Sequence, residues 1–256
     1  RRALEVLDPK WGGTATDQKF PTPVRWRYLV SAYRKWGDAE VKNALVLTLD
    51  NMASGGLYDH VGGGFHRYAV DKTWVVPHFE KMLYDNAQMA SLFLEAGSGL
   101  SNPNYTAIGL DTLDFMLKEL YDKEGGFYAS YDAASAGKEG HFYVWKPAEL
   151  ASLAGKKDGE ALAAMMGVTE EGNFEDNTSV VTRRRLPAKV ALELDREVEE
   201  LEGLFEKWRP TLYQVRAKRD WPRLDTKMVT GWNGLAISAM AEGYRLTGRK
   251  GYLDAA

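Results

Sequence analysis

The sequence contains no cysteine among its 256 residues. This absence excludes disulfide bonds, thiolate nucleophiles, thiolate metal sites and Cys-x-x-Cys redox pairs. No apolar run approaches the roughly 18 residues that a membrane-spanning helix needs, so no membrane partner is expected. The chain begins with Arg1, Arg2 and Ala3, which is typical of neither an initiator methionine nor a signal peptide. We therefore expect a fragment of a longer polypeptide and a cytoplasmic location.

The chain also has little net charge. Lys and Arg number 33 and Asp and Glu number 36, which gives a formal charge of -3 and argues against an electrostatic nucleic-acid binder. The phosphate-binding loop, the Gly-x-Gly-x-x-Gly fingerprint, the Gly-x-Ser-x-Gly elbow and the His-Glu-x-x-His zinc motif are missing. The spacing of His60, His66 and His78 matches no standard metal motif. We predict no cofactor, no metal and no nucleic-acid partner.

Helical periodicity dominates the chain, and long runs of Val, Ile and Thr are missing. The helix around residues 82–94 is apolar nearly all round, and the one from Ala236 is rich in small residues. Because such helices are buried on most sides, an outer layer must cover an inner layer. The sequence thus predicts an all-α fold with a short β-hairpin over residues 127–132 and 141–145. Helices are predicted over residues 23–35, after Asp38, from Pro77 to about Gly97, from after Asn102-Pro103 to about Asp122, over 189–208, and from near Trp232-Asn233 onward.

Short Gly-aromatic segments lie between these helices and form a degenerate internal repeat. They begin at Gly55, Gly63, Gly125 and Gly140. Glycine permits a positive φ, and the aromatic ring anchors the loop to the core. Turn formation explains the glycines but not the polar residues beside them.

The four histidines all lie in these segments, at positions 60, 66, 78 and 141. On a helix that begins at Pro77, His78 and Asp85 share one face because they are seven residues apart, and Glu80 lies on the neighbouring face. A pocket of imidazole, carboxylate, guanidinium and aromatic rings suits a sugar-like ring. We predict His78, Glu80 and Asp85 as the acid/base residues.

Structural roles compete with this interpretation. Asp85 and Glu80 alternatively bond backbone groups of the Gly-rich loops, and His60 alternatively packs a loop. The basic run Arg183-Arg184-Arg185 is interpreted as a solvated turn.

A second polar junction precedes the small-residue helix, in the same position as residues 74–85 before the first inner helix. It contains Lys227 together with three predicted ligand-binding residues, and the two junctions suggest one mouth of one cavity. The predicted ligand-binding residues are Asp59, His66, Arg67, Tyr68, Trp74, Tyr84, Asp132, Asp225, Trp232 and Asn233.

Two long motifs point to a known family. Residues 56–68 (GLYDHVGGGFHRY) and 74–86 (WVVPHFEKMLYDN) resemble those of the spermatogenesis-associated, thioredoxin-domain-containing proteins. Residues 139–145, 172–175 and 224–234 are similar to further motifs of that family, in the same order.

The resemblance implies an N-terminal thioredoxin-like domain followed by an (α/α)6 toroid of the six-hairpin glycosidase class. That superfamily includes N-acylglucosamine 2-epimerase-like enzymes and unsaturated glucuronyl hydrolases. Residues 1–256 are then an incomplete toroid, about half of a full one, without the thioredoxin-like domain. Uncovered inner helices in such a half toroid predict a homodimer.

Three functions follow as hypotheses. The first is a carbohydrate-active domain, hydrolase-like or epimerase-like, that acts on or binds a sugar-like small molecule. The second is a non-catalytic toroid that presents a client to the thioredoxin-like domain of the same polypeptide. The third is a scaffold in which the polar motifs only tie loops to inner helices.

Overall fold

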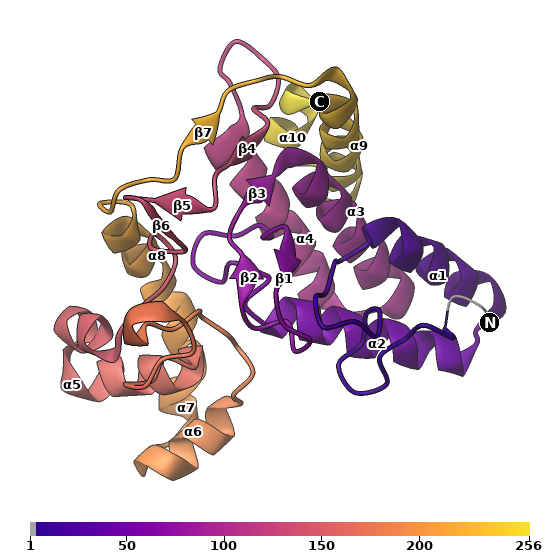
Figure 1. Ribbon diagram of the computed structural model, residues 1–256. Helices are drawn as coiled ribbons and strands as arrows, with labels where there is room; N and C mark the ends of the chain where they lie inside the picture. The colour runs from indigo at the N-terminus through magenta and orange to yellow at the C-terminus, as the bar shows by residue number, and fades with distance from the viewer. Residues whose placement is uncertain (1–3) are drawn as a thin grey trace.

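The computed structural model describes residues 4–256, and the prediction based on Arg1, Arg2 and Ala3 concerns residues outside that range. Its helices and strands are shown in Figure 1. The helices are α1 (Pro23–Trp36), α2 (Ala39–Ser54), α3 (Leu83–Leu100), α4 (Pro103–Phe115), η1 (Met116–Leu120), α5 (Pro147–Met166), η2 (Glu175–Asn177), α6 (Pro187–Leu194), α7 (Val198–Leu201), α8 (Leu204–Arg216), α9 (Thr230–Thr247) and α10 (Lys250–Ala255). The strands are β1 (Tyr68–Ala69), β2 (Pro77–His78), β3 (Lys81–Met82), β4 (Ser130–Tyr131), β5 (Ala134–Ser135), β6 (Lys138–Glu139) and β7 (Leu224–Asp225).

The all-α prediction is confirmed: helices dominate residues 4–256, and the strands there are short antiparallel insertions. Strands β1 and β2 pair antiparallel, as do β5 and β6, and β3, β4 and β7 form a three-stranded sheet. The strands are only two residues long, so they fasten loops to one another and add little core.

Local signals set the helix ends. Helix α1 has Pro23 in its first turn and stops at Gly37, whose left-handed φ of 66° suits glycine. The Asp38 side chain caps α2 by accepting hydrogen bonds from two backbone N–H groups, and Asn102 caps α4 by accepting one. Each of these helix starts is predicted from residues that lie within one turn of it.

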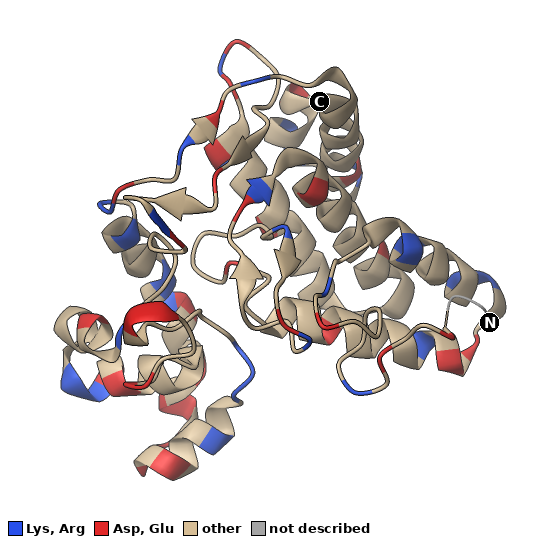
Figure 2. Ribbon diagram, viewed as in Figure 1, with Lys and Arg blue, Asp and Glu red and all other residues tan. Residues whose placement is uncertain are grey.

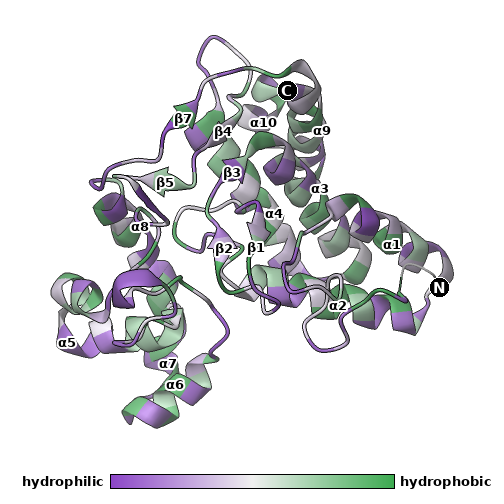
Figure 3. Cartoon of the chain, in the orientation of Figure 1, coloured by the Kyte–Doolittle hydropathy of each residue, from purple (hydrophilic) through white to green (hydrophobic). Residues whose placement is uncertain are grey.

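Helix α3 is the centre of the helical layer. It packs against α1, α4 and α9, and Met89, Leu92 and Phe93 on it are fully buried. Hydrophobic residues also recur along α9, where Ala236 faces inward and Ile237 is 44% exposed (Figure 3). No helix within residues 4–256 is long and apolar enough to cross a membrane.

The helix predicted from Pro77 is wrong in its first six residues. Strand β2 pairs His78 with Tyr68, and β3 pairs Lys81 with Tyr131, so α3 begins only at Leu83. Partners this distant in sequence are invisible to a local periodicity argument. His78 and Asp85 therefore do not share a helix face.

Two other predicted elements differ from the structure. Residues 141–145 form no strand, because β4 pairs instead with β3 and β7 and the local hairpin is β5–β6. The single helix predicted over residues 189–208 is divided into α6, α7 and the start of α8, and Pro210 lies inside α8.

Helices α5 to α8 form a separate lobe, at the lower left of Figure 1. The lobe has its own hydrophobic core around Leu162, Met166, Phe205 and Leu212, whereas α1 to α4 pack around other clusters. Two arginines of α8 join the lobe to the helical layer, because Arg209 pairs with Asp111 and Arg216 with Asp59.

Candidate functional site

The inner helices α3 and α9 each hold a Gly-Gly-Phe loop with an asparagine in their first turn. Asn86 Oδ1 accepts from the Phe65 N–H at 2.7 Å, and its Nδ2 donates to the Phe65 carbonyl at 3.0 Å. Asn233 makes the same two bonds with Phe127, also at 2.7 and 3.0 Å. Asn86 and Asn233 occupy the fourth position of their helices. The paired bonds use both amide atoms of Asn233, which makes it a loop-holding residue.

Glycine is required where these loops approach the helices. Gly64 has a φ of 75°, and a Cβ there would lie 2.8 Å from Asn86 Oδ1 and 2.4 Å from the Phe115 ring. The turn formation predicted for the Gly-aromatic segments therefore also allows the loop to approach the asparagine that binds it.

Asp85, the residue before Asn86 in α3, is a buried acid at the start of this helix. It is 8% exposed, and its Oδ2 is buried without a hydrogen-bond partner in the described structure. Burial raises the pKa of Asp85 to about 7; the charge of Arg67 opposes this rise and the charge of Glu80 adds to it. A carboxyl group with a pKa near neutral pH and a buried oxygen that has no partner is suited to hold and release a proton.

Partly exposed groups surround Asp85. Arg67 Nη1 lies 2.9 Å from Glu80 Oε2, and the backbone N–H of Arg67 donates to the Glu80 carbonyl at 2.9 Å. The Tyr84 ring lies 4.8 Å from the Trp232 ring, between the start of α3 and the start of α9. The two predicted polar junctions therefore meet at this point.

His78 belongs to the neighbouring β1–β2 hairpin. Its Nδ1 lies 2.8 Å from Glu139 Oε1, and its Nε2 lies 3.9 Å from Glu80 Oε2. The His78 ring stacks on Tyr68 at 5.1 Å, and Tyr68 stacks on Phe20 at 4.6 Å. The structure thus brings His78, Glu80 and Asp85 to one region, but from a hairpin, a loop and a helix.

Asp59 lies in the interior with two cations. Lys81 Nζ and Arg216 Nη1 each lie 2.7 Å from one of its carboxylate oxygens. Burial alone would raise the pKa of Asp59, but the charges of Arg216 and Lys81 hold it well below its usual range. This buried triad joins the Gly-rich loop, β3 and α8.

His66 and His60 are buried and neutral. Burial lowers the pKa of His66 to about 3 and that of His60 to about 4. His66 Nδ1 lies 2.9 Å from the Phe79 carbonyl, and His60 Nε2 lies 2.8 Å from the Gly55 carbonyl. Both imidazoles hold backbone in place, as the packing alternative for His60 predicted.

The remaining predicted ligand-binding residues form hydrogen bonds or ion pairs with groups other than Asp85. Trp74 is fully buried, and its indole N–H donates to the Trp11 carbonyl at 2.9 Å. Asp132 accepts from the Ala134 N–H in a turn, and Asp225 pairs with Lys227 at 2.8 Å. No group of three or more His, Asp or Glu side chains that could hold a metal ion occurs within residues 4–256.

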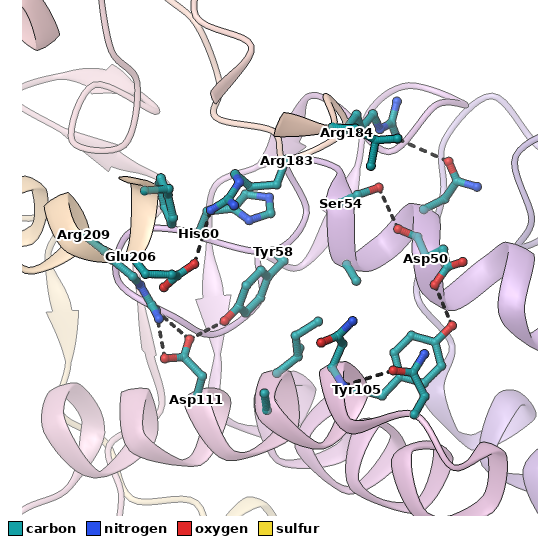
Figure 4. A pocket seen from close by; sticks show the side chains of 18 of the residues that line it. Asp50, Ser54, Tyr58, His60, Tyr105, Asp111, Arg183, Arg184, Glu206 and Arg209 are labelled. Atoms are coloured by element: carbon teal, nitrogen blue, oxygen red, sulfur yellow. Dashed lines mark hydrogen bonds and ion pairs between the residues drawn. The ribbon is translucent and has the colours of Figure 1, made fainter. Parts of the chain in front are cut away.

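Sequence reasoning missed Glu139 and Arg184. Glu139 was placed only in a family motif, and no local signal links it to His78, 61 residues away. Arg184 was assigned to a solvated turn, but it lines a cavity of about 760 Å³ between α2, α4 and the α5–α8 lobe (Figure 4).

The fold and site define a helical-hairpin domain with a polar rim at the starts of its inner helices. The polar rim consists of Asp85 and its neighbours Arg67, His78, Glu80, Tyr84 and Trp232. No family model matches the chain. Spermatogenesis-associated protein 20 from Homo sapiens is 36% identical over 272 residues, and the alignment covers 95% of this chain and 34% of that protein. The mouse protein of that name is 34% identical over 93% of this chain and 34% of its own length. This chain is thus similar over nearly all its length to a part of spermatogenesis-associated protein 20, and it spans about a third of the length of these curated relatives.

Solved structures with similar helical layouts have lower sequence identity. A sugar epimerase from a ruminal bacterium is 12% identical with a TM-score of 0.46, over 99% of this chain and 80% of that one. Cellobiose 2-epimerase from Spirochaeta thermophila is 14% identical with a TM-score of 0.47, over 99% of this chain and 78% of that one.

Proposed function

We propose that the polar rim around Asp85 is a carbohydrate site and that Asp85 is its proton-transferring residue. The observation that carries the proposal is the buried, unpartnered Oδ2 of a carboxyl group whose pKa is about 7. Such a group holds a proton in part of the molecules at neutral pH and can accept one in the rest. It serves either a hydrolase-like step, by protonating a leaving oxygen, or an epimerase-like step, by removing a proton next to a carbonyl.

The neighbours supply the rest of a sugar site. Tyr84 and Trp232 offer adjoining aromatic surface for the apolar face of a ring. Arg67 and Glu80, held together at 2.9 Å, present charged hydrogen-bonding groups, and His78 is a second candidate proton carrier. In this proposal a sugar-like ligand hydrogen-bonds to these groups and to the buried, unpartnered Oδ2 of Asp85.

A non-catalytic binding role is the second candidate. It is favoured by the existing partners of the rim, because Glu80 is paired with Arg67 and His78 with Glu139. In this role the rim presents a client to a thioredoxin-like domain of the longer polypeptide.

The test uses Asp85→Asn, which keeps the shape of the side chain but cannot titrate. Unsaturated uronides and N-acylated hexosamines are screened for turnover by NMR, with this chain and with the full-length protein. We expect Asp85→Asn to lower turnover by about 100-fold or more while ligand binding persists.

The matched control is Asp17→Asn, an exposed aspartate without a described side-chain partner. Full activity in Asp85→Asn, or an equal loss in Asp17→Asn, would contradict the catalytic proposal. Binding of a sugar without turnover by the wild type would support the second candidate instead.

A further inference from the structure

The cavity of about 760 Å³ shares no lining residue with the polar rim around Asp85. Its walls are α2 and α4 on one side and residues 183–186 with α8 on the other. The two sides belong to different hydrophobic cores, so the cavity lies at a junction between lobes. Its size and position are typical of small-molecule sites.

The cationic wall consists of Arg183 and Arg184, which belong to the basic run Arg183-Arg184-Arg185. Figure 2 shows this run as a blue stretch of the loop that enters α6. In Figure 4, Arg183 and Arg184 lie along one rim of the pocket, opposite Tyr105 and Asp111 on α4. Both arginines are partly buried, and burial lowers the pKa of each.

Arg184 has hydrogen-bonding capacity left over. Its Nη2 donates to the Thr73 carbonyl and lies 3.5 Å from Asn51 Oδ1, while its buried Nε has no acceptor in the described structure. No carboxylate among residues 4–256 forms an ion pair with Arg184. The charge of Asp71 acts on Arg184 and opposes the lowering of its pKa, but it does so without a direct ion pair. A desolvated guanidinium with no carboxylate in direct contact is an anion-binding group.

The acids of the cavity do not neutralise this rim. Asp111 is used by Arg209, whose Nη2 lies 2.8 and 2.7 Å from its two oxygens, and by the Tyr58 hydroxyl. Glu206 is 3.4 Å from Arg183, and its side chain is 65% exposed. An ion pair with a long N–O distance and a solvent-exposed carboxylate is weak, so Arg183 is also available to a ligand.

The opposite wall carries groups that suit hydroxyls. Asp50 accepts from the Tyr105 hydroxyl at 2.6 Å, and Asn104 and Ser54 also line the space. Trp11 and Ile108 add apolar surface. The cavity therefore combines an anion-binding rim with a polar, partly aromatic body.

We propose that this cavity binds a small anionic sugar derivative, with its phosphate or carboxylate at Arg183 and Arg184 and its hydroxyls toward Asp50 and Asn104. The site is separate from Asp85 and does not depend on the proposed function. Arg184 anchors the anion, and Trp11, whose ring lies 5.4 Å from the Arg184 guanidinium, lies beside it.

The test titrates the chain with glucose 6-phosphate, glucuronate and glucose, by calorimetry and by NMR of the Trp11 indole N–H, assigned with Trp11→Phe. We expect at least one anionic probe to bind and to shift the Trp11 signal, and glucose to bind more weakly. The preferred anion distinguishes a phosphate site from a carboxylate site. Arg184→Gln should weaken binding about tenfold or more, because a charge-assisted hydrogen bond is lost.

Arg185→Gln is the matched control, since Arg185 is the next residue and pairs with Glu193 at the surface. It should leave the affinity unchanged. If Arg184→Gln does not fold by circular dichroism, Arg183→Gln takes its place with the same expectation. The proposal is overturned if neither anion binds at millimolar concentration, if binding leaves the Trp11 signal in place, or if Arg185→Gln weakens binding as much as Arg184→Gln.

Discussion

Lys81 and Asp59 form an ion pair of 2.7 Å in which the side chains are only 2% and 5% exposed. Arg216, from α8 in the other lobe, completes the site at 2.7 Å from the same carboxylate. Two cations thus share one acid inside the protein, and Lys81 also donates to the Gly63 carbonyl at 2.8 Å. The carboxylate is the group on which the burial of both cations depends.

Asp59→Asn is expected to destabilise the protein strongly, because it leaves Lys81 and Arg216 buried without a counter-charge. The free energy of unfolding in urea should fall by about 3–5 kcal/mol. Since the folded-state pKa of Asp59 lies below its unfolded value, its contribution is present above about pH 4 and is lost as the pH falls through the folded-state pKa. A loss below about 1 kcal/mol would contradict the role assigned to the triad.

Asp85→Asn is expected to have the opposite effect on stability. The folded-state pKa of about 7 lies above the usual value, so ionisation of Asp85 opposes folding as the pH rises from about 4 to about 7. The variant should be more stable than the wild type by about 1–4 kcal/mol at pH 8, and the difference should vanish near pH 4. Thermal unfolding at both pH values measures this, and a variant less stable at pH 8 would show that the ionised carboxylate has a stabilising partner.

The two asparagine substitutions should differ in size. Asn86 also donates to the Met82 carbonyl at 2.9 Å, and Asn233 donates to the Val229 carbonyl at 3.2 Å, but Asn86 is fully buried whereas Asn233 is partly exposed. Asn86→Ala leaves the buried Phe65 N–H without an acceptor and should cost about 2–4 kcal/mol, and Asn233→Ala about 1 kcal/mol. Chemical denaturation of both variants checks the order, and a larger loss in Asn233→Ala would contradict it.

The sequence predicted those parts of the fold that local residues determine. Asp38, Asn102 and Gly37 mark helix ends through contacts within one turn, and the apolar α3 is the buried centre as its composition indicated. The paired junctions before α3 and α9 were also predicted to meet, and the contact between Tyr84 and Trp232 joins them.

The remaining features depend on pairing between distant segments. Lys81 pairs with Tyr131 and His78 contacts Glu139, so residues 77–82 leave the helix that their periodicity indicated. Arg184 lies in a cavity only because the α5–α8 lobe docks on α2 and α4. Neither effect has a signal within one helical turn of the residue concerned.

Helices α3 and α9 share the asparagine that binds a Gly-Gly-Phe loop but differ in the residue just before it. Asn86 and Asn233 seat equivalent loops, while the position just before each holds Asp85 in one copy and Trp232 in the other. Asp85 and Trp232 therefore occupy equivalent positions, the third residue of each helix, and neither takes part in the asparagine bonds. New chemistry can arise there by single substitutions that leave the loop anchorage, and with it the fold, untouched.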